Sequence, residues 1–271
     1  MPPRFGAITE NERPEIFAWI LQDEFQNVND AFITKRDGKT LALASRFVFD
    51  SISGDEIGKY VFTLFVNAEE RRSELLDVDI VLKNAIPARL KFEKRLPQSS
   101  DSNEYYEVVT GDLEQHLVVE TVNRYAVAED IEGTERDVFV SAFPFELTIF
   151  ESMEDLDKLL GLDRPIRVGN TDLTVGGLSD TFASPGNLFS ENEDSEPWSF
   201  MVGEILSFRE ITISFGSVKR DAYLVTLRSA LGELPTLVGK EMFDTRAIGA
   251  GKIIGMNTYI KANLIEGNYP R

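Results

Sequence analysis

Residues 252–264 read Lys-Ile-Ile-Gly-Met-Asn-Thr-Tyr-Ile-Lys-Ala-Asn-Leu, and the alternation in this stretch decides what kind of fold the chain builds. In an extended strand, successive side chains point to opposite faces. We therefore expect a strand with one face in a hydrophobic core. Besides Thr258, that face carries the apolar residues Ile254, Met256, Ile260, Ala262 and Leu264.

The opposite face of the same segment is a candidate ligand-binding face. It places an aromatic ring and a cation between two amides, in the order Asn257, Tyr259, Lys261 and Asn263. Small barrels of the OB type bind their ligands with a face of this kind. An ordinary solvated strand face accounts for the same pattern, so both interpretations stay open.

Short runs of β-branched and aromatic residues predict strands along most of the remaining chain. The Asp37-Gly38 pair between the first two runs is a hairpin signal. The expected strands cover residues 32–36, 40–49, 60–66, 78–82, 88–92, 105–110, 117–127, 136–143 and 145–150, then 202–208, 210–215, 222–228 and 234–238.

Three segments predict helical structure. An amphipathic helix is expected from a capping box at Thr9 to about Val28. Residues 68–76 contain charged residues with good helix propensity, enough for one or two turns. A short helix over 152–160 should end at Gly161.

Together these elements predict an α+β, mainly β, fold of two domains. Residues 1–165 form an N-terminal mixed or antiparallel sheet domain with flanking helices. Residues 166–199 are rich in polar and turn-forming residues and are expected to be a linker or long loop. Residues 200–271 contain five short strands, which predict a small antiparallel β-barrel, OB-like or SH3-like in size.

The composition excludes several kinds of chemistry. The 271 residues contain no Cys, which excludes thiol catalysis, Cys-bound zinc, iron–sulfur clusters and disulfides. The single His, His116, excludes any metal site with a pair of histidines. Neither a nucleophile elbow nor a phosphate-binding loop is present, so no catalytic or cofactor-binding residue is assigned and no cofactor is expected.

Carboxylate-only metal sites are compatible with this composition. Asp77 and Asp79 are two residues apart in an expected strand, so both carboxylates would lie on one face. Oxygen ligands suit magnesium, calcium or manganese. In a chain with 46 acidic residues such pairs also arise by chance.

The negative charge is concentrated in one quarter of the chain. The net charge is −18, from 28 basic and 46 acidic residues, yet residues 101–165 alone hold 4 basic and 17 acidic residues. This balance argues against binding to nucleic acid or to an anionic membrane. The acidic region 101–165 either keeps the protein soluble or is a docking surface for a basic partner.

These observations favour a non-enzymatic protein-binding or assembly protein. It either engages a protein partner or associates with a second copy of itself, in the latter case through a sheet edge. The alternatives are a carboxylate or divalent-metal-dependent hydrolase that uses Asp77 and Asp79, and a ligand-binding barrel module. No apolar run is long enough to cross a membrane and no secretory signal is evident, so we expect a cytoplasmic protein.

Overall fold

The computed structural model describes thirteen stretches of the chain, which contain nearly all of the expected strands. They are residues 30–36, 39–67, 72–83, 87–97, 104–111, 114–122, 130–162, 166–168, 171–173, 179–186, 197–215, 218–242 and 248–264. The side chains of residues 30–46, 62–78, 166–173, 215 and 218 are not part of this description. The helix expected from Thr9 to Val28 lies outside the described residues.

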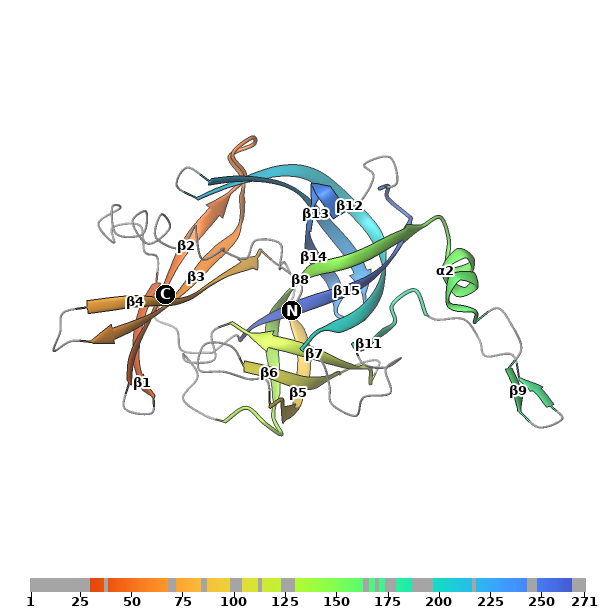
Figure 1. Ribbon diagram of the computed structural model, residues 1–271, viewed down its shortest axis with the longest axis horizontal. Helices are drawn as coiled ribbons and strands as arrows, with labels where there is room; N and C mark the ends of the chain where they lie inside the picture. The colour runs from red at the N-terminus through yellow and green to blue at the C-terminus, as the bar shows by residue number, and fades with distance from the viewer. Residues whose placement is uncertain are drawn as a thin grey trace.

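The first strands form a four-stranded antiparallel sheet in sequential order (Figure 1). Its members are β1 (Asp30–Arg36), β2 (Lys39–Phe49), β3 (Glu56–Asn67) and β4 (Arg72–Leu82). The antiparallel pairing expected on either side of Asp37-Gly38 is confirmed, because β1 and β2 pair up to Arg36 and Lys39; the two turn residues lie outside the described residues. The helical turns expected over 68–76 are wrong for residues 72–76, which lie in β4 and pair with β3 except at the bulge at Leu76; residues 68–71 lie outside the described residues. Pairing with a neighbouring strand overrides the helix propensity of this segment.

Nine further strands form a large mixed sheet in the order β11-β12-β13-β14-β8-β15-β7-β6-β5. The chain is thus mainly β, as expected. In chain order these strands are β5 (Ala88–Arg95), β6 (Glu104–Thr110), β7 (His116–Thr121), β8 (Glu135–Phe150), β11 (Ala183–Pro185), β12 (Ser199–Phe215), β13 (Val218–Ser229), β14 (Gly232–Gly239) and β15 (Ile253–Leu264). A separate hairpin joins β9 (Ile166–Val168) to β10 (Thr171–Leu173), and a 3-10 turn, η2 (Lys240–Met242), follows β14.

The β8–β15 pair lies at the centre of the nine-stranded sheet. The two strands are antiparallel, from Ile253 opposite Phe150 to Leu264 opposite Val138. The other edge of β15 pairs with β12 and then, in parallel, with β7, while β8 also pairs with β5 and β14. The strands therefore form two closed circuits of pairing that share the β8–β15 pair. One circuit runs through β12, β13 and β14, and the other runs through β7, β6 and β5.

This arrangement bears on the expected two-domain organisation. Strands from both sides of residues 166–199 lie in one sheet. A barrel built from residues 200–271 alone is not confirmed, because the circuit of pairings through β12, β13, β14 and β15 closes only through β8. The domain boundaries at 165 and 200 stay predictions.

Two strands, β8 and β12, are longer than the sequence suggests, and each contains a bulge. The expected strands 136–143 and 145–150 are one strand, β8, with a register shift where Pro144 and Glu146 oppose Thr258 and Asn257. In β12 a second shift falls between Ile205 and Ser207. An extra residue on one strand bends the strand without ending the pairing.

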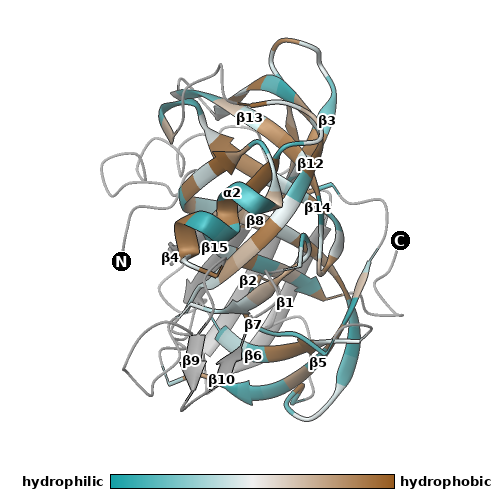
Figure 2. Ribbon diagram, turned by 90° about the vertical axis from the view of Figure 1, so that its right-hand side faces the viewer, coloured by the Kyte–Doolittle hydropathy of each residue, from teal (hydrophilic) through white to brown (hydrophobic). Residues whose placement is uncertain are grey.

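The two faces of the nine-stranded sheet contribute to separate cores. The apolar set of β15 is buried in the larger core, as expected; there Ile254, Met256 and Ile260 lie with residues of β5–β8 and β12–β14. A second core lies between the two sheets, where Tyr259 and Phe143 meet Val48, Ile57 and Ile80 of the four-stranded sheet. Brown, hydrophobic residues alternate along several strands in Figure 2.

The single described α-helix, α2 (Met153–Leu160), packs on the same sheet. It ends as expected at Gly161, whose φ of 70° is left-handed and suits glycine. Leu156 contacts Val202 and Ile253 in a small apolar cluster, and Figure 2 shows the helix lying across β8 and β15. Among the described residues, no helix is long and apolar enough to cross a membrane.

Candidate functional site

The four residues of the candidate ligand face on β15 lie in different environments. Tyr259 is fully buried, with its ring centroid 5.2 Å from that of Phe145. Asn257 is half-buried, and its amide donates a hydrogen bond of 2.9 Å to the Glu146 carboxylate. Asn263 is also half-buried. The four side chains therefore do not present one continuous open face.

Lys261, the fourth of these residues, lies in a buried ionic cluster. Only 5% of Lys261 is exposed, and its ammonium contacts the carboxylate of Asp79, which is 6% exposed. The Lys261 Nζ is also 3.8 Å from Oε1 of Glu120, which is 2% exposed. We call Asp79, Glu120 and Lys261 the buried cluster. Charged side chains are almost never this buried unless they are paired.

Strand register explains why these three side chains meet. Lys261 and Glu120 are directly opposite each other in the parallel pairing of β15 with β7. On its other side, Lys261 is opposite Ser141 of β8. The Ser141 hydroxyl accepts a 3.0 Å hydrogen bond from the Leu82 backbone N–H, which holds the end of β4 against β8. This contact brings Asp79, three residues before Leu82, to the ammonium.

The buried cluster joins two sites that the sequence places apart. Asp79 comes from the candidate metal pair and Lys261 from the candidate ligand face. Asp77 lies in β4 opposite Thr63, with a side chain outside the described set. A divalent cation at Asp79 would compete with the Lys261 ammonium for the carboxylate. The described part of the chain contains no group of three His, Cys, Asp or Glu that could hold a metal. Both sites stay predictions.

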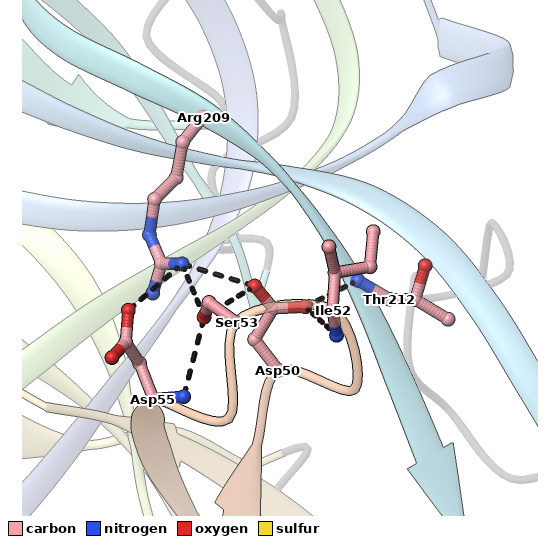
Figure 3. A network of polar contacts seen from close by, with 6 residues as sticks. All are labelled: Asp50, Ile52, Ser53, Asp55, Arg209 and Thr212. Carbon is pink, nitrogen blue, oxygen red and sulfur yellow. Dashed lines mark hydrogen bonds and ion pairs between the residues drawn. The ribbon is translucent and has the colours of Figure 1, made fainter.

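A second polar network, which the sequence does not single out, joins the two sheets at the β2–β3 turn (Figure 3). Asp50 is only 2% exposed. Its Oδ1 accepts hydrogen bonds from the backbone N–H groups of Ile52 (3.1 Å) and Thr212 (3.0 Å). Its Oδ2 accepts from the Ser53 hydroxyl (2.8 Å) and from Arg209 Nη1 (3.1 Å). We call these residues the Asp50 junction.

The hydrogen bonds at this junction favour the charged form of Asp50. Desolvation by itself raises the pKa of the Asp50 carboxyl, but the bonds from Thr212, Ile52 and Ser53 outweigh it and lower the pKa below its ordinary value. Asp50 also forms an isolated bridge with Ile213 of β12. An acidic residue that bonds to a backbone N–H two positions on is typical of Asx turns. The sequence therefore contains a local signal for the turn. It contains none for the partner Arg209, which is 159 residues away.

Exposed apolar side chains lie next to the Asp50 junction. Phe49 is 50% and Ile52 is 71% exposed in or beside the turn. Leu206 and Phe208 of β12 are also 38% and 40% exposed, but Phe208 is opposite Val225 of the larger core and so lies on the other face of β12 from Arg209. Single exposed apolar residues are common, so only Phe49 and Ile52, which flank Asp50 in the chain, form a candidate contact point at this turn.

The acidic region 101–165 is partly neutralised in space by cations that precede it in sequence. Arg89 of β5 bonds to Glu135 (3.2 Å) and Asp137 (3.3 Å) of β8. These bonds raise the pKa of the Arg89 guanidinium, the one to Glu135 most. Arg95 pairs with the buried Glu104 at 3.1 Å. The charge of this surface is therefore less one-sided than the sequence count implies.

The only histidine lies on the same surface. His116 at the start of β7 has an exposed side chain, with Nδ1 3.6 Å from a Glu93 carboxylate oxygen. An exposed pair of this kind contributes little to stability.

Comparisons of the chain with protein-family models, with curated proteins and with solved structures found no match.

Proposed function

We propose that this chain is a non-enzymatic protein-binding or assembly protein. The observation that carries the proposal is the pair of exposed apolar side chains at the Asp50 junction, Phe49 and Ile52. The same turn is held by the backbone and side-chain bonds to Asp50. A preorganised turn loses little conformational entropy when it binds, so its apolar side chains are well suited to contact a partner.

The acidic region 101–165 supports a basic partner as part of the same proposal. Exposed carboxylates of this region include Glu146, Glu151 and Glu154 on β8, at its end and on α2. Complementary charge raises the rate of association, and the attraction between the charges weakens as salt is added. Affinity that falls as salt rises would support a basic partner; affinity independent of salt would contradict it.

Two finer expectations belong to this proposal. The circuits of pairing through β8 and β15 support a barrel-like arrangement of the C-terminal strands, in which β8 completes the ring. A cytoplasmic location agrees with a sequence that lacks cysteine and glycosylation sequons.

The experiment compares the tagged full-length chain with two variants. The test variant carries Phe49→Ser and Ile52→Ser. The matched control carries Leu159→Ser on α2, where the leucine is 67% exposed but distant in sequence from the junction. Proteins captured from the native cell are identified by mass spectrometry and retested after purification, and light scattering measures self-association.

A purified partner, or a second copy, that binds the wild type and the Leu159 control but not the test variant would support the proposal. Equal binding by all three chains would contradict the role of the junction. A wild type that captures no partner and scatters as a 30.5 kDa monomer would contradict the proposal itself.

A further inference from the structure

The buried cluster combines an amine, a carboxyl group that contacts it and a second carboxylate within reach of the amine. The Lys261 ammonium contacts Asp79, and Glu120 Oε1 lies 3.8 Å from the same nitrogen. Side-chain exposure is 6% for Lys261, 7% for Asp79 and 1% for Glu120. These are the parts that an amide condensation needs: a nucleophile, an acyl group and a proton carrier.

We propose that Lys261 and Asp79 are joined by an amide bond that forms spontaneously within the folded chain, with Glu120 as the general acid and base. The inference does not depend on the binding function proposed above. It assigns a modification site to the two residues that join β15 to the four-stranded sheet.

The surroundings of the cluster favour this reaction. Burial disfavours separate charges, so a proton passes more easily from the ammonium to the Asp79 carboxylate, which leaves a neutral amine beside a neutral acid. The Nζ is 5.8 Å from the centre of the Phe143 ring, and Phe143 is 1% exposed. Exclusion of water from this site also protects the amide from hydrolysis.

The strands hold the reacting atoms in place. Lys261 is fixed between Glu120 on β7 and Ser141 on β8 by register, and Ser141 binds the end of β4. Holding two groups in contact replaces a bimolecular encounter and supplies a large effective concentration. Condensation between Lys and Asp side chains is unfavourable in bulk water, and this preorganisation offsets that disadvantage.

The reaction balances without an oxidant or a co-reactant. The lone pair of the neutral Nζ attacks Cγ of the protonated Asp79 carboxyl, and the Glu120 carboxylate takes a proton from Nζ. Glu120 then returns this proton to the departing hydroxyl. The Cγ–O bond breaks, water leaves, an Nζ–Cγ amide remains and Glu120 is again a carboxylate.

The test is the intact mass of the denatured full-length protein, followed by peptide mapping. We expect the wild type to be lighter than its sequence mass by one water. Trypsin should release a branched peptide in which residues 73–83 are joined to residues 253–271, with no cleavage after Lys261. A wild type with the full sequence mass would overturn the proposal, as would a water loss mapped to another peptide, such as ring closure at Asp37-Gly38.

Three variants assign the roles of the residues. Lys261→Arg removes the amine nucleophile, and Glu120→Gln keeps both reacting groups but removes the proton carrier; we expect both to have the full sequence mass, with folding checked by circular dichroism. The matched control is Lys252→Met, which removes a lysine whose 2.7 Å pair with Glu151 is exposed, and which should retain the water loss. A folded Glu120→Gln protein that still loses water at Lys261 would overturn the role of Glu120.

Discussion

The buried cluster and the Asp50 junction both connect the four-stranded sheet to the nine-stranded sheet, but they satisfy their carboxylates differently. At the junction, neutral backbone N–H groups of Ile52 and Thr212 hold Asp50, and Arg209 retains 39% of its side-chain exposure. In the buried cluster, Asp79 contacts an ammonium that is itself buried. We therefore expect the first arrangement to tolerate the loss of its cation and the second to depend on it.

This difference concerns stability: whether the paired cation is buried matters more than how many ion pairs the carboxylate forms. A half-exposed guanidinium can be replaced by water, so its loss costs little. A buried ammonium leaves two carboxylates without compensation when it is removed. The predictions below test this contrast, beginning with the largest expected effect.

Replacing Lys261 with Met should cause the largest loss of stability. We expect the free energy of unfolding to fall by about 3–5 kcal/mol because Asp79 and Glu120 remain buried without their cation, and by about 5 kcal/mol more because the proposed cross-link is lost. Chemical denaturation measures this loss.

A triple variant, Asp79→Leu with Glu120→Leu and Lys261→Met, separates two contributions. Removing all three charges should recover the part of the loss that comes from unpaired charge. A cross-link between residues 182 positions apart would add about 5 kcal/mol by loop closure, and the triple variant would still lack it. A triple variant less stable than Lys261→Met would contradict the claim that unpaired buried charge causes part of the loss.

Replacing Asp50 with Ala should cost about 2–4 kcal/mol, because the backbone N–H groups of Ile52 and Thr212 lose their acceptor. Replacing Arg209 with Ala should cost about 1 kcal/mol or less, since its side chain is 39% exposed. Urea unfolding of the two variants compares these effects. If Arg209→Ala were as damaging as Asp50→Ala, the cation rather than the backbone would hold the junction.

Asp50 should also make stability dependent on acid. Its pKa is lower in the folded protein than the ordinary value of 3.8, so its contribution is complete above that value and is lost as the pH falls through the folded pKa. The stability gap between the wild type and Asp50→Asn should therefore shrink below about pH 4. Denaturant unfolding across this pH range measures the gap; a gap that widens in acid would contradict the direction of the pKa shift.

The smallest effect is expected at the exposed pair of Lys252 and Glu151. Glu151 is 76% exposed, so Lys252→Met should change the free energy of unfolding by about 0.5 kcal/mol or less. Thermal unfolding provides the measurement. A loss comparable with that of Lys261→Met would show that burial does not separate the two lysines.

Much of the local structure could be predicted from the sequence, because it depends on neighbours in the chain. The alternation in β15, the Asp37-Gly38 hairpin and the Gly161 helix end are of this kind. Residues 72–76 are different: their composition favours a helix, and only the pairing with β3 makes them a strand.

The candidate sites could be predicted only in part, for the same reason. Periodicity identifies Lys261 as polar and on the opposite face from Met256, but it cannot show that the four-stranded sheet covers that face. The sequence singles out Asp79 and Lys261 for unrelated reasons, and their contact depends on how β4 lies against β8. Sequence patterns do not reveal the Asp50 junction, because most of its bonds come from distant or backbone groups.

The position of β15 in the chain has a consequence for biosynthesis. This strand pairs with β8, β12 and β7 and contributes to both large cores, yet its residues are translated after nearly all of their partners. Until the ribosome has passed Leu264, the nascent chain carries unpaired strand edges and an incomplete core. Such a chain completes its fold late, through long-range contacts, and exposes aggregation-prone strand edges until then.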